Sequence, residues 1–411
     1  MAYLSHLGIT SFRNLAELNL DLPPGVVVFF GGNAQGKTAL LEAVYILAIA
    51  RSFRADNERE VVNFQAAAVG GMALVNGVIE SGGEQLRVYV GYQSVAKPTA
   101  NAPAPKNIND VDEDGGAPAY SVRKQIRVNR VRRTAAELVG LVNAVLFSVE
   151  DIELVHGPPS GRRRFLDIML SQADPMYVKA LQRYQKVVQQ RNHLLRLLRD
   201  GRAQLDELAF WDAQLVTEGA WITWRRKEAL ADLAPICVQQ HRELGGQEGD
   251  LAVTYRPSIP FGNDVGDTVA IIEDRFREAL AAAQGRERAT AATAVGPHRD
   301  DFDMVIDRVD MGIYSSRGEA RTLALTLKLS EAAYLTAARA DGPIVLLDDV
   351  LSEMDAGRRE KVLGKASQYQ QALITTTDVE LVRDHYGGDA AYFKVEAGVV
   401  SPVAASQLVQ C

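Results

Sequence analysis

Residues 31–38 read Gly31-Gly32-Asn33-Ala34-Gln35-Gly36-Lys37-Thr38, a glycine followed by four residues and then by glycine, lysine and threonine. An apolar run typical of a buried strand precedes this stretch at residues 26–30, and residues 39–47 follow it with apolar side chains at helical spacing. In such a strand, loop and helix, backbone N–H groups of the loop and the helix N-terminus point at bound phosphates. The stretch therefore predicts a nucleotide site, rather than a glycine-rich turn that only ends a strand.

Every residue of this motif is a predicted nucleotide contact, and two of its side chains have predicted roles. Lys37 is expected to reach the β- and γ-phosphates of the nucleotide. The hydroxyl group of Thr38 is expected to bind Mg²⁺.

A second apolar run, at residues 344–347, ends in Asp348 and Asp349, which is the pattern of a buried parallel strand with carboxylates at its tip. Ligands of open α/β sheets bind at such tips. Asp348 is predicted to bind Mg²⁺, directly or through water, and Asp349 to orient or polarise the attacking water. The alternative is a buried strand that happens to end in two aspartates.

A long insertion separates these two halves of the predicted site. Residues 160–245 have the apolar spacing of helices, which predicts an inserted helical arm and a head built from both chain ends. The expected fold class is α/β, with residues 1–150 as the first part of the head and its β-rich lobe, 151–290 as the arm lobe, and 291–411 as the second part of the head. The arm is far shorter than the coiled coils of chromosome-structuring proteins.

A second anion-binding pattern lies between the halves, where the segment 315–322 contains Ser316-Arg317-Gly318 and precedes a helical stretch at residues 323–329. A Ser-x-Gly turn that opens a helix can bind an anion. Because the head already has its own phosphate loop, this turn is predicted to contact a nucleotide held by another subunit. A simple helix cap explains the same residues.

Composition and charge restrict the possible function classes. With 411 residues and 47% hydrophobic side chains, the chain is long enough for two or three domains. Because its formal net charge is −7, the chain has no overall positive field that would attract nucleic acid. Cys237 and Cys411 lie far apart, which argues against a zinc site or a disulfide framework and fits a reducing cytosol. The sequence shows neither a signal-peptide pattern nor an apolar run of ~20 residues, so we expect a soluble cytoplasmic protein.

Any DNA binding would therefore have to use local basic patches. One patch crowds a predicted strand and turn and consists of Arg123, Lys124, Arg127, Arg130, Arg132 and Arg133. These side chains are candidates for phosphate contact, with a solvated strand face as the equal alternative. A second cluster, Arg162-Arg163-Arg164, either touches DNA backbone or pairs with acidic residues of its own domain. Residues 94–119 are rich in Pro, Ala, Asn, Asp and Gly and are expected to form a disordered excursion.

Several further motifs resemble the RecF family, bacterial ATP-binding recombination mediators that are related to ABC-type and SMC ATPases. The resemblance covers essentially the whole chain except residues 94–119. Besides residues 31–38, the matching stretches are residues 146–167, 190–195, 296–301, 347–355 and 375–378. The stretch Gly296-Pro297-His298-Arg299-Asp300-Asp301 is close to a family fingerprint, although no chemical role follows from its residues.

The resemblance implies an ABC/SMC-like ATPase head with ATP and Mg²⁺ as cofactors. It places Ser316 and Gly318 in the signature motif, residues 352–355 in the D-loop, and Thr377 where related ATPases carry a switch histidine. Lys37, Asp349 and Ser316 are the implied catalytic residues. The chain departs from the family pattern at Arg317 and Glu319, where glutamines are usual, and at Val149, where proline is common.

The resemblance also implies a function in recombinational repair. Two heads would close over two ATP molecules as an ATP-dependent homodimer with an isologous interface. The dimer would bind double-stranded DNA near single-strand gaps and work with RecR and RecO to load RecA, and a weak DNA-stimulated ATPase activity would reopen it.

Three other classes of protein share parts of this pattern. A P-loop kinase should lack both the Ser-x-Gly helix start and the bipartite head. An SMC-type protein with a tethering role needs a longer arm and a hinge. ATPases of the overcoming-lysogenization or retron type usually carry a nuclease domain, for which this chain has no spare length.

Overall fold

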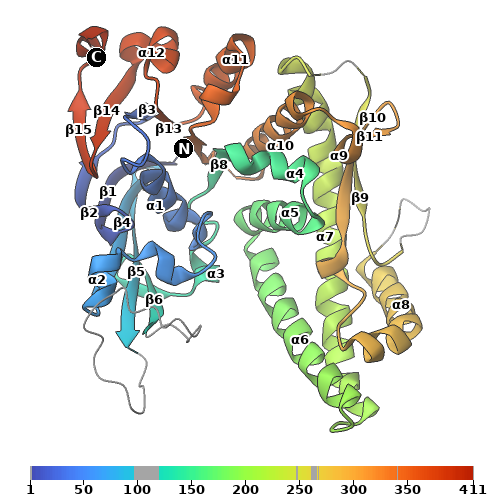
Figure 1. Cartoon of the computed structure of the whole chain (residues 1–411). Helices are drawn as coiled ribbons and strands as arrows, with labels where there is room; N and C mark the ends of the chain where they lie inside the picture. The colour runs from blue at the N-terminus through green and yellow to red at the C-terminus, as the bar shows by residue number, and fades with distance from the viewer. Residues whose placement is uncertain are drawn as a thin grey trace, which may run out of the picture. The chain divides into compact units, whose positions relative to one another are not determined.

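The computed structural model describes residues 2–96, 120–246, 249–260, 266, 268–339 and 341–410. The chain forms two compact units, Met1–Val149 with Arg339–Cys411, and Glu150–Ala338 (Figure 1). The first unit thus joins both ends of the chain. Residues 291–338, which the sequence analysis assigns to the second part of the head, group instead with the second unit.

A largely parallel sheet forms one half of the first unit. Its strand order is β15-β14-β3-β13-β12-β8, and only the edge strand β15 runs antiparallel to its neighbour. The strands are β3 (Gly25–Phe30), β8 (Ala144–Ser148), β12 (Ile344–Asp348), β13 (Gln371–Thr376), β14 (Ala390–Glu396) and β15 (Val399–Val403). The inner strands are almost wholly buried, because parallel strands are covered on both faces. The buried strand predicted before Asp348 is β12.

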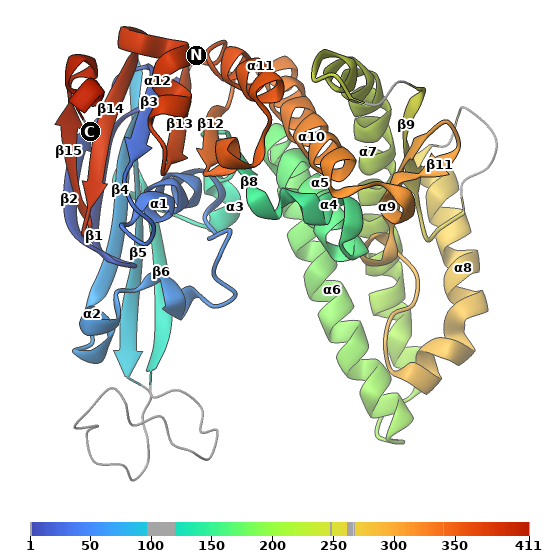
Figure 2. The same ribbon diagram turned by 45° about the horizontal axis from the view of Figure 1, so that its top comes forward.

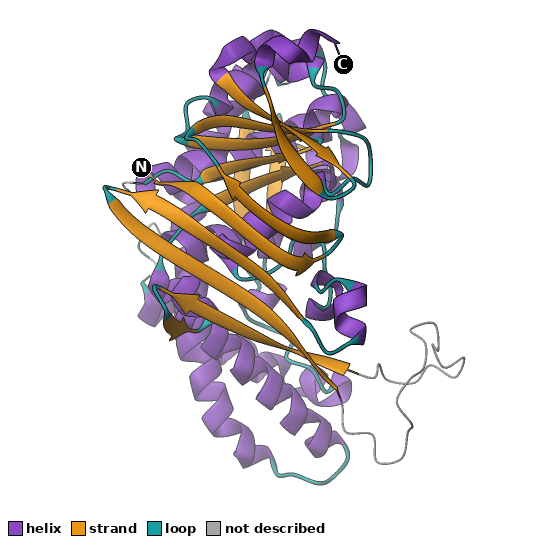
Figure 3. Ribbon diagram, turned by 90° about the vertical axis from the view of Figure 1, so that its left-hand side faces the viewer, coloured by secondary structure: helices purple, strands orange, loops and turns teal. Residues whose placement is uncertain are grey.

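An antiparallel sheet forms the other half of the first unit and corresponds to the predicted β-rich lobe (Figure 3). Its order is β2-β1-β4-β5-β6-β7. The strands are β1 (Ala2–Phe12), β2 (Leu15–Asp21), β4 (Met72–Ser81), β5 (Glu84–Ala96), β6 (Tyr120–Val128) and β7 (Val131–Arg133). Residues 94–96 of the predicted excursion belong to β5, and residues 97–119 lie outside the described residues.

Helix α1 (Lys37–Ile49) contacts strands of both sheets, including β4 and β13. Nearly all of its residues are buried, as expected for a helix that is apolar on every side. The helix that follows the phosphate loop is therefore fixed within the core of the first unit. The other helices of this unit are α2 (Phe64–Ala68), α3 (Ala135–Leu138), α11 (Ala356–Ala366) and α12 (Glu380–Tyr386).

The second unit is mainly helical, as the arm prediction requires, but it also contains a small sheet (Figure 2). Its helices are α4 (Glu153–His156), α5 (Pro159–Ala173), α6 (Pro175–Arg199), α7 (Leu208–Glu243), α8 (Val269–Thr290), α9 (Met311–Tyr314) and α10 (Arg317–Ala338). Strands β9 (Leu251–Arg256), β10 (Asp301–Ile306) and β11 (Val309–Asp310) form the antiparallel sheet β11-β10-β9. Helix α7 packs against α6, α8, α10 and β9 and is the centre of this core. None of the helices within the described ranges is both long and apolar enough to cross a membrane.

Candidate nucleotide site

The loop between β3 and α1 follows a path that only glycine can take at two positions. Gly36 has a φ angle of 112°, and a Cβ atom there would lie 3.0 Å from Leu15 Cδ2. A Cβ atom on Gly31 would lie 2.2 Å from the carbonyl oxygen of Val395. Any larger residue at either position would push the loop out of this conformation.

The side chain of Lys37 folds back into this loop. Its Nζ donates hydrogen bonds to the carbonyl oxygens of Gly31 (2.9 Å) and Gly32 (2.7 Å). Burial lowers the pKa of Lys37, while the charges of Asp349 and Asp348 act in the opposite direction. The ammonium group is thus held within the loop by neutral acceptors, which phosphate oxygens can replace.

The two halves of the predicted site meet at Thr38 and Asp348, which are 310 residues apart in the chain. Thr38 Oγ1 donates a hydrogen bond of 2.9 Å to Asp348 Oδ1, and Thr375 Oγ1 donates one of 2.8 Å to the same oxygen. The meeting follows from the sheet, because β3 and β12 both flank β13 and the carboxyl ends of parallel strands share one edge. A hydroxyl and a carboxylate oxygen fit Mg²⁺, which takes the rest of its oxygen ligands from phosphate and water.

Asp349 has a left-handed backbone conformation, with a φ angle of 53°. Its N–H donates to Thr375 Oγ1 (3.0 Å), which fixes the turn after β12. Its own Oδ1 is buried and has no hydrogen-bond partner within the described part of the chain. A buried carboxylate oxygen without a donor is costly unless a ligand or water supplies one. This geometry suits the predicted contact with an attacking water, and that role stays a prediction.

The predicted signature motif opens helix α10 in the second unit. Ser316 N donates to Glu319 Oε2 (2.7 Å), and Glu319 N donates to Ser316 Oγ (3.3 Å), which is a reciprocal capping box. These hydrogen bonds lower the pKa of Glu319. The capping box gives a physical reason for glutamate at a position where the family usually has glutamine. Ser316, Arg317 and Gly318 are all exposed, so the helix start is accessible to a ligand.

The other positions that the resemblance singles out follow the carboxyl ends of β8, β12 and β13. Ser352 Oγ donates to the carbonyl oxygen of Asp349 (2.9 Å), and Asp355 caps α11 by accepting a hydrogen bond from Arg358 N (2.9 Å). Thr377 follows the last residue of β13 and is exposed. Val149, which replaces the usual proline, is exposed directly after β8.

Comparisons with known proteins agree with this geometry. A family model described as the RecF/RecN/SMC N terminal domain matches residues 3–397. The protein named DNA replication and repair protein RecF of Roseiflexus castenholzii is 38% identical over 409 residues, which is 97% of this chain and 100% of the relative. The protein of the same name from Herpetosiphon aurantiacus is 37% identical, with the same coverage. The chain belongs to the RecF family.

Solved structures support the same assignment. A structure of the recombination mediator protein RecF with ATP, in the RecFOR pathway, has a TM-score of 0.83 and 31% identity, and the alignment covers 98% of both chains. An Smc head domain from Pyrococcus furiosus has a TM-score of 0.50 at 13% identity and shares the fold alone. The predicted fold class, an ATPase head of ABC/SMC type, is therefore confirmed.

The predicted DNA-contact residues do not all share one face of the sheet. Arg123 and Arg127 are exposed on β6, whereas Lys124 lies on the opposite face of the strand. Lys124 Nζ donates to the carbonyl oxygen of Ala50 and forms an ion pair with Glu58, so its charge is compensated within the first unit. We therefore remove Lys124 from the set of outward candidates.

Two of the outward arginines lie opposite each other on neighbouring strands. Arg127 lies directly opposite Arg132, and its guanidinium lies 5.6 Å from the ring centroid of Tyr89 on β5. Like charges directly opposite each other destabilise a sheet unless a counter-ion lies between them. Arg130 occupies the turn, and Arg133 pairs with Glu137 (3.2 Å). Arg87 on β5 is also exposed, and the sequence analysis missed it because it stands alone in the chain.

The family fingerprint at residues 296–301 surrounds a buried arginine that the sequence analysis also missed. Arg226 on α7 donates to the carbonyl oxygen of Pro297 (2.6 Å), to Asp167 Oδ1 (2.7 Å) and to Tyr177 Oη (3.0 Å). Burial alone would lower the pKa of Arg226, but Asp167 and its other partners raise it well above the usual value. The carboxylate of Asp300, fully buried, lies 3.9 Å away.

His298 completes this buried network. Its Nε2 lies 3.1 Å from the carbonyl oxygen of Thr293, which can only accept, so Nε2 carries the proton and Nδ1 accepts from the Tyr184 hydroxyl (2.6 Å). Burial lowers the pKa of His298 to about 4. The buried members of the fingerprint thus link the start of β10 to α6 and α7, which is a structural role within the second unit.

Proposed function

We propose that the chain is an ATP-dependent DNA-binding protein of recombinational repair and replication-fork maintenance. Its membership of the RecF family and the names of its relatives support this proposal. The observation that carries the ATP-dependent part is the hydrogen bond between Thr38 and Asp348, which joins the predicted Mg²⁺ ligands.

In this proposal the first unit binds Mg-ATP. Backbone N–H groups of residues 31–38 hold the β- and γ-phosphates, and Lys37 exchanges its two carbonyl acceptors for phosphate oxygens. Thr38 and Asp348 hold Mg²⁺, which neutralises charge on the transferred phosphate. Asp349 orients the attacking water through its unpartnered oxygen.

A second copy of the chain completes each ATP site. Ser316 and Gly318 of one copy contact the γ-phosphate held by the other, and Thr377 lies at the position of the switch residue. Two identical patches then meet in an isologous dimer. ATP closes this dimer, and a weak, DNA-stimulated hydrolysis opens it again.

The dimer binds double-stranded DNA at gaps or junctions with single strands, and it acts with RecR and RecO to load RecA. The outward arginines of β6 and β7 contact phosphates of the duplex without reading its sequence. Two observations support a contact with DNA phosphates: the guanidinium of Arg127 lies over the ring of Tyr89, and Arg127 and Arg132 lie opposite each other on β6 and β7.

Substitution of Ser316 tests the dimer. Ser316→Arg places a bulky cation where the γ-phosphate must approach, so we expect ATP binding to persist while ATP-driven dimerisation and hydrolysis are lost. Ser316→Asp keeps a good helix cap but adds a charge that repels phosphate, so it should fold and still fail to dimerise. Ser401→Arg, on the exposed edge strand β15, is the matched control. Sedimentation with and without ATP measures the outcome, and normal dimerisation of Ser316→Asp would leave Ser316 as a helix cap only.

Charge removal on the β6–β7 hairpin tests the DNA contact. The double variant Arg127→Gln with Arg132→Gln should bind all duplexes, gapped or not, with similarly reduced affinity. The salt dependence of binding should become less steep by about one unit of slope per lost phosphate contact. Arg277→Gln, an exposed arginine of α8 that pairs with Glu273 and Asp274, is the control. An unchanged slope in the double variant would show that the hairpin does not contact DNA and that its arginines form a solvated strand face.

A further inference from the structure

The second unit contains a surface pocket of about 460 Å³ that is separate from the phosphate loop of the first unit. Its walls come from the first turn of α5, the end of β9 and the fingerprint at residues 296–301. Three arginines, Arg163, Arg256 and Arg299, line the pocket. Two sequence features without an assigned function, the arginine run at residues 162–164 and the fingerprint, therefore converge here.

Two of these arginines have only neutral acceptors among the described residues. Arg163 donates from its NH1 to the carbonyl oxygen of Asp300 (2.9 Å). Arg299 donates from its Nε and NH2 to the carbonyl oxygen of Thr293 (3.2 and 2.9 Å). A guanidinium has five N–H donors, so both side chains keep donors and a full charge for a ligand.

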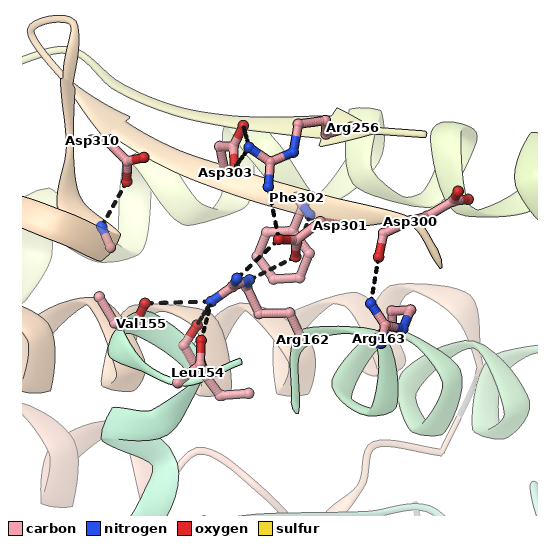
Figure 4. A network of polar contacts seen from close by, with 12 residues as sticks. Leu154, Val155, Arg162, Arg163, Arg256, Asp300, Asp301, Phe302, Asp303 and Asp310 are labelled. Carbon is pink, nitrogen blue, oxygen red and sulfur yellow. Dashed lines mark hydrogen bonds and ion pairs between the residues drawn. The ribbon is translucent and has the colours of Figure 1, made fainter. Parts of the chain in front are cut away.

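The carboxylate that lines the pocket, Asp301, is already paired with two arginines. Asp301 accepts two hydrogen bonds from Arg162 (2.7 and 2.9 Å) and one from Arg256 (3.0 Å) (Figure 4). Arg162 is not itself part of the lining, and Arg256 also pairs with Asp303. Among the described residues, neither Arg163 nor Arg299 is thus directly paired with a carboxylate, although the charges of Asp301, Asp300 and Asp167 act on Arg163 from further away.

The surroundings of Arg163 favour an anion. Burial lowers the pKa of Arg163 and the neighbouring charge of Arg226 lowers it further, and the opposing charges of Asp301, Asp300 and Asp167 do not outweigh these effects. A partly buried cation without a directly paired carboxylate is costly, and an anion bound to its remaining N–H donors would relieve that cost. Helix α5 begins without a side-chain cap, so its first turn adds partial positive charge to the same pocket.

We propose that this pocket binds a phosphate group, held by the guanidinium groups of Arg163 and Arg299 beside the first turn of α5. The planar fork of arginine matches two phosphate oxygens at once, which an ammonium group does not. The phosphate is either a phosphodiester of DNA, which rests on the proposed function, or a free phosphate ion. Both sources share this chemistry, and the experiment separates them.

The first arm titrates inorganic phosphate into the full chain by calorimetry while a non-hydrolysable ATP analogue occupies the phosphate loop. We expect binding to the parent, and a weakening of about tenfold or more in Arg163→Gln and in Arg299→Gln, from the loss of a charge-assisted hydrogen bond. Arg299 is exposed, so its variant should fold even if Arg163→Gln does not. The control is Arg164→Gln, which removes the same charge from the next position of α5, an exposed residue outside the pocket lining. Its affinity for inorganic phosphate should stay within about twofold of that of the parent.

The second arm measures duplex binding of the same variants as a function of salt. A backbone phosphate in the pocket lowers the salt slope by about one unit in Arg163→Gln and Arg299→Gln, but not in Arg164→Gln. An effect on inorganic phosphate alone assigns the pocket to the free ion. Parent-like behaviour of both pocket variants in both arms, or an equal loss in Arg164→Gln, overturns the proposal. A parent chain that binds no duplex refutes the proposed function, while the phosphate arm still tests the pocket.

Discussion

Replacement of Arg226 by methionine should destabilise the second unit more than any exposed ion pair could. Methionine fills a similar length of apolar space but cannot donate to Pro297, Asp167 or Tyr177. The side chain of Arg226 is only 2% exposed, so water cannot take the place of the lost donors. Asp300, at 0% exposed, would keep its hydrogen bond from Ser258 N but would lose its nearest positive charge.

The burial of this cluster sets the size of the effect. Removing one partner of a buried ionic network costs about 3–5 kcal/mol, because the other charge stays buried and uncompensated. For a unit of this size, each kcal/mol lowers the unfolding midpoint by about 2–4 °C, so we expect a decrease of about 6–20 °C. An exposed pair contributes about 0.2–1 kcal/mol, which corresponds to a few degrees at most.

Tryptophan fluorescence can follow this unit by itself, because all three tryptophans, Trp211, Trp221 and Trp224, lie on α7. The matched control is Arg183→Met, because Arg183 makes a similar paired contact with Glu218 but its side chain is 57% exposed. Thermal unfolding of parent, Arg226→Met and Arg183→Met should give a large decrease only for the buried site. Equal shifts in the two variants would refute the reasoning from burial.

Three further predictions concern the nucleotide loop, the carboxylate beside it and the half-buried His298. Lys37→Ala should abolish stable ATP binding in equilibrium titrations, while Lys361→Ala on α11 should not; parent-like affinity in the first variant would contradict the phosphate-loop assignment. Asp349→Asn should retain ATP binding but slow single-turnover hydrolysis by about 10²-fold or more, and an equal loss of binding would make Asp349 a metal ligand instead. Because the pKa of His298 is lowered to about 4, its neutral form stabilises the folded unit above about pH 6.5, and this contribution is lost as the pH falls toward 4. The difference in unfolding midpoint between the parent and His298→Gln should therefore shrink over that range, and a constant difference would show that His298 does not titrate in this way.

The sequence by itself determined the nature of the nucleotide site. The motif at residues 31–38 and the apolar run before Asp348 each depend on local properties, namely backbone freedom at glycine and burial of a continuous apolar strand. Local pattern also predicted the long helices of the arm. The Ser316-x-x-Glu319 spacing is also the local pattern of a capping box, which the structure contains.

Only the tertiary structure decided which distant residues meet. The order of the parallel strands brings Thr38 to Asp348, and no local pattern specifies that order. The alternation of β6 turns Lys124 inward toward Glu58 while Arg123 and Arg127 face outward, which a count of basic residues does not show. The packing of α5, β9 and the fingerprint likewise gives Arg163 and Arg299 only carbonyl acceptors, whereas the adjacent Arg162 is paired with Asp301. The sequence specifies which side chains are charged, but whether each charge meets an opposite charge depends on contacts that form only when the chain has folded.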